Sequence, residues 1–349
     1  MLQEGGLVAF PTETVYGLGA DAFNCRAVER IFAAKGRPGD NPLIVHVASW
    51  EQVELLAKEP PALLYKLGQR FWPGPLTLVV KRQEKVPAAV AAGLDTVAVR
   101  WPAHPVALAL IEAANLPVAA PSANRSGRPS PTAAQHVQED LGEEIDLLLD
   151  GGPAGIGVES TVLDLTAPVP AILRPGGVTR EELEEVLGEV AVAPELAGEK
   201  PLSPGMKYRH YAPRAPLWLL PAGAGDVAEA ERQINVFLRR CRETGQRAGL
   251  LLSEETFRKI FREEAFRSGE RKPEGAFPEE VAVLGSRLRL AEVAASLYPA
   301  LRLMDHRGVD IILAESFPEA GLGLAIMNRL RRAAQGVWAL PAEEGRESS

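Results

Sequence analysis

The chain has 349 residues, of which 46% are hydrophobic and 24% are charged, ordinary values for a folded protein that exclude disordered and fibrous classes. At roughly 150 residues per domain, this length predicts two domains. The formal net charge of −8 is uneven, because residues 1–193 carry 15 Lys and Arg against 24 Asp and Glu. Neither half has the strongly basic surface that non-specific nucleic-acid binding requires, so no stable nucleic-acid binding is expected.

Targeting and redox features are absent from the sequence. It contains no apolar run of about 18 residues, and its first ten residues lack the basic start and apolar core of a signal peptide. We therefore expect a cytoplasmic protein without membrane association. Cys25 and Cys241 lie far apart with no C-x-x-C motif, so neither a disulfide framework nor a structural zinc site is expected.

The first half alternates short β-rich runs with helical segments. Residues 7–10 predict a strand, and residues 26–36 predict a helix whose apolar positions recur near the 3.6-residue period until Gly36 ends it. Further strands are expected in PLIVHV, LTLVVKR, TVAVRWP, LPVAAPS, DLLLDGG, STVLDLT and AILRPGG. Because several of these strands have no helix between them, residues 1–193 predict a twisted mixed sheet with helices packed on it.

Helix starts are also readable in this half. The segment PTAAQHVQEDLG predicts a helix with Thr132 as its N-cap, and TREELEEVLGE predicts one with Thr179 and Glu182 spaced as a capping box.

The organisation changes after residue 193. Residues 194–216 contain five prolines and no apolar periodicity, which predicts a linker. Its Tyr208, Arg209, His210 and Tyr211 suggest a lid over a binding site. Residues 217–340 alternate strand and helix strictly, which predicts a smaller Rossmann-like domain with a parallel sheet, and residues 341–349 predict a frayed tail.

Two cations stand beside restricted backbone in the segment KGRPGDNP. Glycine and proline fix a turn around Lys35 and Arg37, so these side chains are expected to project from an exposed loop, and Asn41 could join them in binding an oxyanion such as a phosphate chain. The alternative is an ordinary solvated helix C-terminus, where the helix dipole favours cations. This segment alone favours the second interpretation.

Polar side chains gather at two other strand ends. In APSANRSGRPSPT, Ser122 and Asn124 are two residues apart and point to one side if the backbone is extended, as a ligand site or as a simple turn. Thr12, Thr14 and Tyr16 follow the first strand, at a position where α/β proteins place ligand sites. Four isolated polar residues are weaker candidates: Thr96, Arg100, Ser160 and Arg174.

Several catalytic motifs are missing. The sequence has no P-loop, no nucleophile elbow and no H-E-x-x-H motif, and its five histidines show no metal-ligand spacing. His46, inside the apolar run LIVHV, would by default be a core histidine. Catalysis by positioning and charge stabilisation fits these residues better than a covalent nucleophile.

Taken together, PTETVYGLGADA, KGRP with NPLIVHV, FWPGPLTLVV, VAVRWPAHP, APSANRSGRPSPT, GVESTVLD and ILRPGG resemble the L-threonylcarbamoyl-AMP (threonylcarbamoyladenylate) synthase family. The YrdC-like domain of that family is marked by K-x-R and S-x-N, which are Lys35-Gly36-Arg37 and Ser122-Ala123-Asn124 here. The segment SPGMKYRHYAP and the domain after it are similar to the long form of the family.

The resemblance implies a nucleotidyltransferase that joins L-threonine, bicarbonate and ATP, with Mg²⁺ carried by ATP and no tightly bound cofactor. Its product would pass to the tRNA threonylcarbamoyl transferase complex, which modifies the adenosine next to the anticodon. Carried over, the catalytic residues are Lys35, Arg37, Ser122 and Asn124. The threonine residues are Thr14, His46, Arg100, Ser122 and Ser160. The ATP residues are Arg37, Asn41, Thr96, Asn124, Thr132, Arg174 and Tyr211.

Three alternatives stay open at this point. A nucleic-acid-binding module conflicts with the acidic first half. A carbamoyl transferase of the hydrogenase-maturation type shares the YrdC-like domain, but it needs zinc-binding cysteine pairs that two cysteines cannot supply. The third alternative makes the C-terminal domain a separate small-molecule sensor of unknown ligand.

Overall fold

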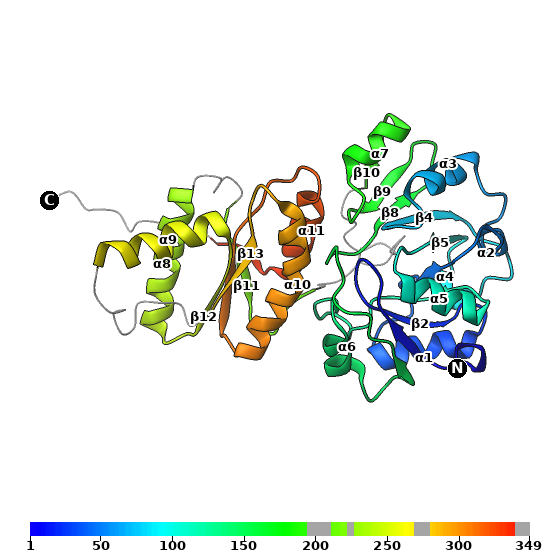
Figure 1. Ribbon diagram of the computed structural model, residues 1–349, viewed down its shortest axis with the longest axis horizontal. Helices are drawn as coiled ribbons and strands as arrows, with labels where there is room; N and C mark the ends of the chain where they lie inside the picture. The colour runs from blue at the N-terminus through cyan, green and yellow to red at the C-terminus, as the bar shows by residue number, and fades with distance from the viewer. Residues whose placement is uncertain (194–210, 222–226, 269–279, 339–349) are drawn as a thin grey trace. The chain divides into compact units, whose positions relative to one another are not determined.

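The computed structural model describes residues 1–193, 211–221, 227–268 and 280–338 and divides into two compact units (Figure 1). The first unit comprises Met1–Tyr211 with Ala320–Ala325, and the second comprises Ala212–Glu319 with Ile326–Ser349. The tail 341–349 and most of the predicted linker, with Tyr208, Arg209 and His210 of the proposed lid, lie outside the described residues. The domain boundaries expected from composition therefore stay a prediction.

The first unit is built on one mixed sheet. Its strands are β1 Val8–Phe10, β2 Gly17–Asp21, β3 Ile44–His46, β4 Leu76–Lys81, β5 Thr96–Arg100, β6 Val118–Ala119, β7 Leu147–Leu148, β8 Thr161–Asp164, β9 Ala171–Arg174 and β10 Ala191–Val192. Their order across the sheet is β10-β9-β8-β4-β5-β3-β6-β2-β1-β7. Antiparallel pairs such as β4–β5 stand beside parallel pairs such as β3–β5, so the predicted mixed sheet is confirmed.

Helices pack on this sheet and enclose its core. They are α1 Cys25–Lys35, α2 Trp50–Leu56, α3 Ala62–Phe71, α4 Ala88–Ala91, α5 Pro105–Ala114, α6 Ala134–Leu141 and α7 Arg180–Leu187, after a short 3₁₀ turn at Leu2–Glu4. Val28 and Ile31 on α1 are fully buried in one apolar cluster with Leu18, Val45 and Val99 of the sheet. Burying this stripe holds α1, and therefore its C-terminal end, against the strands that carry the site.

Local capping signals decide where these helices begin and end. The α7 helix has the predicted capping box of Thr179 and Glu182, with both reciprocal hydrogen bonds present. The predicted helix α6 is present, but the prediction of Thr132 as its N-cap was wrong, because the N-cap is Ala133 and no side chain caps it. The backbone nitrogen of Thr132 instead donates to Nδ1 of His136 at 3.2 Å, which fixes this residue before the helix starts.

The second unit has a wholly parallel sheet. Its strands are β11 Leu217–Leu219, β12 Ala248–Ser253, β13 Glu280–Gly285, β14 Ile311–Ala314 and β15 Gly336–Val337, and its helices are α8 Val227–Thr244, α9 Glu254–Ser268, α10 Leu290–Arg307 and α11 Gly323–Ala333. The strand order is β13-β12-β14-β11-β15, and Figure 1 shows α8 and α9 on one face with α10 and α11 on the other. The predicted parallel sheet with two covered faces is confirmed, and the short β15 is an addition to it.

A search of the described helices for a membrane span found none with the necessary length and hydropathy.

Candidate active site

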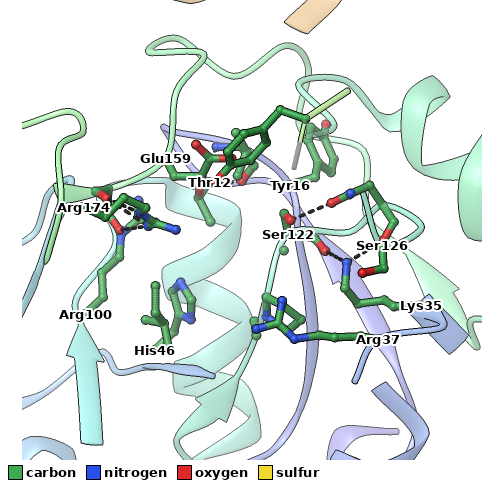
Figure 2. Close-up of a pocket in the computed structure, with 18 of the residues that line it drawn as sticks. Thr12, Tyr16, Lys35, Arg37, His46, Arg100, Ser122, Ser126, Glu159 and Arg174 are labelled. Carbon is green, nitrogen blue, oxygen red and sulfur yellow. Dashed lines mark hydrogen bonds between the residues drawn. The ribbon is translucent and has the colours of Figure 1, made fainter. Parts of the chain in front are cut away.

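A pocket of about 700 Å³, including the solvent at its mouth, opens in the first unit. Strands β3, β5 and β9 supply three of the predicted site residues to its wall, which are His46, Arg100 and Arg174. Loops and helix ends supply the others, which are Lys35, Arg37, Ser122, Asn124, Ser160 and Tyr211. Figure 2 shows Arg174, Arg100 and His46 on one side of the pocket and Lys35, Arg37 and Ser126 on the other.

Strand register places the first group of residues in one row. Arg174 pairs with Val162, Val162 with Thr77, Thr77 with Arg100, and Arg100 with His46, across five neighbouring strands. Residues paired across a sheet point to the same face, so the two arginines and the histidine face the pocket together. At about 4.8 Å between strands, Arg100 and Arg174 start about 14 Å apart and reach toward a common space.

Lys35 differs from the exposed loop cation expected from the sequence. It is the last residue of α1, only 3% exposed, because Gly36 takes the left-handed conformation (φ 59°) that ends the helix one residue later. Its Nζ donates to the carbonyl oxygens of Ser122 and Asn124, both at 2.5 Å. Burial, with a smaller contribution from Arg37, lowers the pKa of Lys35 well below its usual value. The lysine of K-x-R therefore joins α1 to the backbone of S-x-N.

Arg37 lies after the helix end, half-buried at the pocket wall. Its Nη2 donates to the carbonyl oxygens of Asn41 and Pro42, each at 3.2 Å, so the turn after Gly36 holds the guanidinium in place. Burial lowers the pKa of Arg37 to about 10; the charge of Tyr211 opposes this effect, and a smaller contribution from the positive charge of Arg174 adds to it. Two cations close enough to repel each other favour binding of a polyanion between them.

The S-x-N side chains meet as predicted, although the backbone differs from the expected extended form. The backbone N–H of Asn124 donates to the backbone carbonyl of Ser122 at 3.1 Å, so the segment is a tight turn. Within this turn the Ser122 hydroxyl donates to Oδ1 of Asn124 at 2.6 Å, while Nδ2 of Asn124 donates to the carbonyls of Arg125 and Arg128. The side-chain amide of Asn124 thus fixes the loop, and Ser122 lies at the pocket surface.

His46 is buried and neutral. Burial, with a further contribution from the positive charge of Arg100, lowers its pKa to about 3. The ring packs edge-on against Phe10, and Nδ1 has no hydrogen-bond partner among the described residues. A neutral imidazole with a free ring nitrogen can bind a hydroxyl or amine of a ligand without adding charge to the pocket.

The two arginines of the row are held differently. Arg100 is 4% exposed, and its Nη2 lies 2.6 Å from Oε1 of Glu13. Arg174 donates through Nη2 to the carbonyl and hydroxyl oxygens of Ser160, whose hydroxyl lies 2.7 Å from that of Thr77. Arg100 therefore carries a carboxylate beside it, and Arg174 is anchored on the neutral oxygens of Ser160, just before β8.

Four predicted site residues are not among those lining the pocket. Thr14 is fully buried behind Thr12, with their hydroxyl oxygens 2.8 Å apart. Asn41 and Thr132 are also buried, and Thr96 starts β5 about 13 Å from Arg100 at 3.3 Å per residue. Their expected contacts with threonine or ATP stay predictions.

The sequence did not single out two acidic residues at this site. Glu159 lines the pocket, is 5% exposed and accepts a hydrogen bond from Ser130 at 2.6 Å. Glu13 pairs with Arg100 from the turn that Thr12 forms. No sequence pattern indicated the role of Glu13, because its partner Arg100 lies 87 residues away.

Comparisons with known proteins identify the family of this chain. The family model described as "Telomere recombination" matches residues 1–176, and the one described as "Threonylcarbamoyl-AMP synthase, C-terminal domain" matches residues 178–335. A threonylcarbamoyl-AMP synthase of Pyrococcus abyssi is 50% identical over 95% of this chain and 91% of its own length. The chain belongs to the threonylcarbamoyl-AMP synthase family.

A second relative and a solved structure also match almost the whole chain. The threonylcarbamoyl-AMP synthase of Bacillus subtilis is 48% identical over 96% of this chain and 91% of its own length. A crystal structure of the P. abyssi protein Sua5 in complex with L-threonine superimposes with a TM-score of 0.85 at 49% identity, covering 96% of this chain and 93% of that one. The match extends over both units, so the predicted long form with its accessory domain is confirmed.

Proposed function

We propose that this protein is an L-threonylcarbamoyladenylate synthase, a nucleotidyltransferase that converts L-threonine, bicarbonate and ATP into threonylcarbamoyl-AMP and pyrophosphate. The observation that carries the proposal is the joining of K-x-R to S-x-N by the Lys35 ammonium, in a pocket that also contains Arg37, Arg100 and Arg174. The relatives named threonylcarbamoyl-AMP synthase, one of them bound to L-threonine, support the choice of substrate.

The reaction consists of two steps. The free amine of threonine takes up the carbon of bicarbonate, releases water and becomes an N-carboxylate. An oxygen of this carboxylate attacks the α-phosphorus of ATP, the bond to the β,γ-pyrophosphate breaks, and the mixed anhydride forms. Both reactants of the second step are anions, so the protein has to neutralise charge and align two groups that repel each other.

The ATP side of this task falls to Arg37 and Arg174. Arg37 is fixed by the carbonyls of its own turn and Arg174 by Ser160, and both guanidiniums lie at the pocket wall. Guanidiniums preorganised in this way offset the charge that develops on the leaving pyrophosphate, with no reorganisation cost during the reaction.

The threonine side falls to the row on β3 and β5. Arg100 pairs with the α-carboxylate, and neutral His46 and the hydroxyls of Ser122 and Ser160 orient the rest of the amino acid. Because Arg100 and His46 come from adjacent strands, they hold the amine at a fixed distance from the triphosphate. Alignment and charge neutralisation are therefore the main catalytic contributions.

Mg²⁺ enters this scheme with its substrate. The described residues hold no group of three or more His, Cys, Asp or Glu side chains arranged for a metal. We assign Mg²⁺ to the triphosphate oxygens, where it would neutralise charge beside Arg37 and Arg174. The product, a labile adenylate, would be passed in the cytoplasm to the tRNA threonylcarbamoyl transferase complex.

The decisive experiment measures pyrophosphate release from ATP by the full chain. Release is expected only when threonine, bicarbonate and Mg²⁺ are all present, with serine as the control amino acid. Release that does not respond to threonine or bicarbonate would refute the proposal.

A further inference from the structure

The carboxylate of Glu13 lies against the arginine that we assign to threonine. The loop that carries Glu13 is fixed on both sides, since Thr12 accepts hydrogen bonds from the next amides and the carbonyl of Glu13 accepts from Ile156 at 2.8 Å. Oε1 of Glu13 lies 2.6 Å from Nη2 of Arg100. Arg100 lines the pocket and Glu13 holds it from outside the lining, so the position of this guanidinium is fixed.

The Glu13 charge acts mainly on Arg100. Its second oxygen, Oε2, is buried and has no hydrogen-bond partner among the described residues. The hydrogen bonds of Arg100 use Nε and Nη2, which leaves Nη1 available to a ligand in the described part of the chain. The guanidinium of Arg100 can thus bind one further carboxylate, although the charge of Glu13 already offsets its own.

The pocket presents a problem of selection that such a pair can solve. Arg100 and Arg174 face the same space from one cross-strand row, and the charge of Arg174 is near enough to Arg37 to lower the pKa of Arg37. Phosphate groups bind arginine at least as well as a carboxylate does. A triphosphate could therefore occupy Arg100 and exclude the amino acid.

We propose that Glu13 is a specificity-determining residue, which offsets the charge of Arg100 so that this end of the pocket accepts an amino acid zwitterion and rejects phosphate. The Arg100–Glu13 pair has no net charge, and neither does a zwitterion, whose carboxylate meets the arginine while its ammonium is attracted to Glu13. A phosphate has no positive group and would be repelled by the Glu13 carboxylate. The inference rests on the proposed function, because it assumes that Arg100 binds threonine.

The test measures threonine binding to the full chain by calorimetry, with and without millimolar inorganic phosphate. Phosphate is expected to raise the threonine dissociation constant of Glu13→Gln at least about fivefold, by competition at Arg100, and that of the wild type less than about twofold. Glu13→Asp keeps the charge and should behave as the wild type does. Asp146→Asn, which removes the carboxylate partner of Arg30 away from the pocket, is the matched control and should also be unaffected.

A purely structural role for Glu13 would give a different result. It would weaken threonine binding in Glu13→Gln without making it sensitive to phosphate, and that result would overturn the proposal. Competition by phosphate in the wild type would overturn it too, even if Glu13→Gln failed to fold. Threonine-dependent pyrophosphate release in phosphate-free buffer is measured alongside, and its absence in the wild type would instead refute the proposed function.

Discussion

Lys35 links two motifs through charge-assisted hydrogen bonds, so its replacement should affect stability as well as turnover. In Lys35→Met the carbonyls of Ser122 and Asn124 lose a buried donor. We expect a loss of about 2 to 4 kcal/mol in the free energy of unfolding and of orders of magnitude in pyrophosphate release. Urea unfolding and the pyrophosphate assay measure the two effects.

Arg37→Met is the matched comparison for Lys35→Met. Arg37 is half-buried and its hydrogen bonds, at 3.2 Å, are to carbonyls of its own turn. It should lose turnover to a similar degree with a change in unfolding free energy of less than about 1 kcal/mol. Equal stability of the two variants would show that Lys35 does not hold the S-x-N turn.

His46 should make stability depend on acid pH. Its pKa is about 3 in the folded protein, against an ordinary value of 6.5 that applies when the chain unfolds. Below pH 6.5 the unfolded chain takes up a proton that the folded protein does not, so the stability contribution is present above pH 6.5 and is lost as pH falls toward 3.

From pH 7 to pH 5, the wild type should lose about 2 kcal/mol more unfolding free energy than His46→Gln, which cannot titrate at this position. Urea unfolding of both proteins at the two pH values measures the difference, and effects of other groups cancel in it. Parallel pH dependence of the two proteins would contradict a buried neutral histidine.

At the scale of elements, the end of α1 decides where both cations of K-x-R lie. Gly36 has φ 59°, and a Cβ built there would meet nothing within 4 Å. The stability of Gly36→Ala should therefore change only through its backbone conformation. The expected loss is about 1 kcal/mol in unfolding free energy, with a smaller loss for Gly36→Asn. Gly39→Ala is the control, because Gly39 has equally open surroundings without a positive φ. Equal stability of Gly36→Ala and Gly39→Ala would show that the left-handed conformation of Gly36 does not require glycine.

The same elements show what could be predicted from sequence. The Gly36 stop and the capping box of α7 were predictable, because each depends on residues within one helical turn. The row that joins Arg174, Arg100 and His46 was not, because it depends on the register of strands distant in the chain. Family motifs named these residues, but neither the burial of Lys35 nor the partner of Arg100 followed from them.

At the scale of the whole molecule, the hydrophobic pattern predicted the change from a mixed sheet to strict strand–helix alternation, since this periodicity extends over many residues. The residue before the second unit also contributes to the pocket. Tyr211 is 5% exposed, lines the pocket of the first unit, and directly precedes Ala212, where the second unit begins. It holds a left-handed conformation with φ 64°, which a non-glycine residue adopts only when its surroundings favour it.

We therefore expect Tyr211, which directly precedes the second unit, to contribute to ATP binding. Tyr211→Ala should raise the KM for ATP about tenfold through loss of an aromatic surface for the nucleotide, and Tyr211→Phe should change it little. A chain that ends at residue 193 also lacks this ring and should show at least the same increase, with pyrophosphate release as the measurement. If the shortened chain, once shown to be folded by circular dichroism, kept the wild-type KM for ATP, then Tyr211 would not form part of the nucleotide site. A KM raised far beyond that of Tyr211→Ala would instead mean that other residues after 193 also contribute to ATP binding.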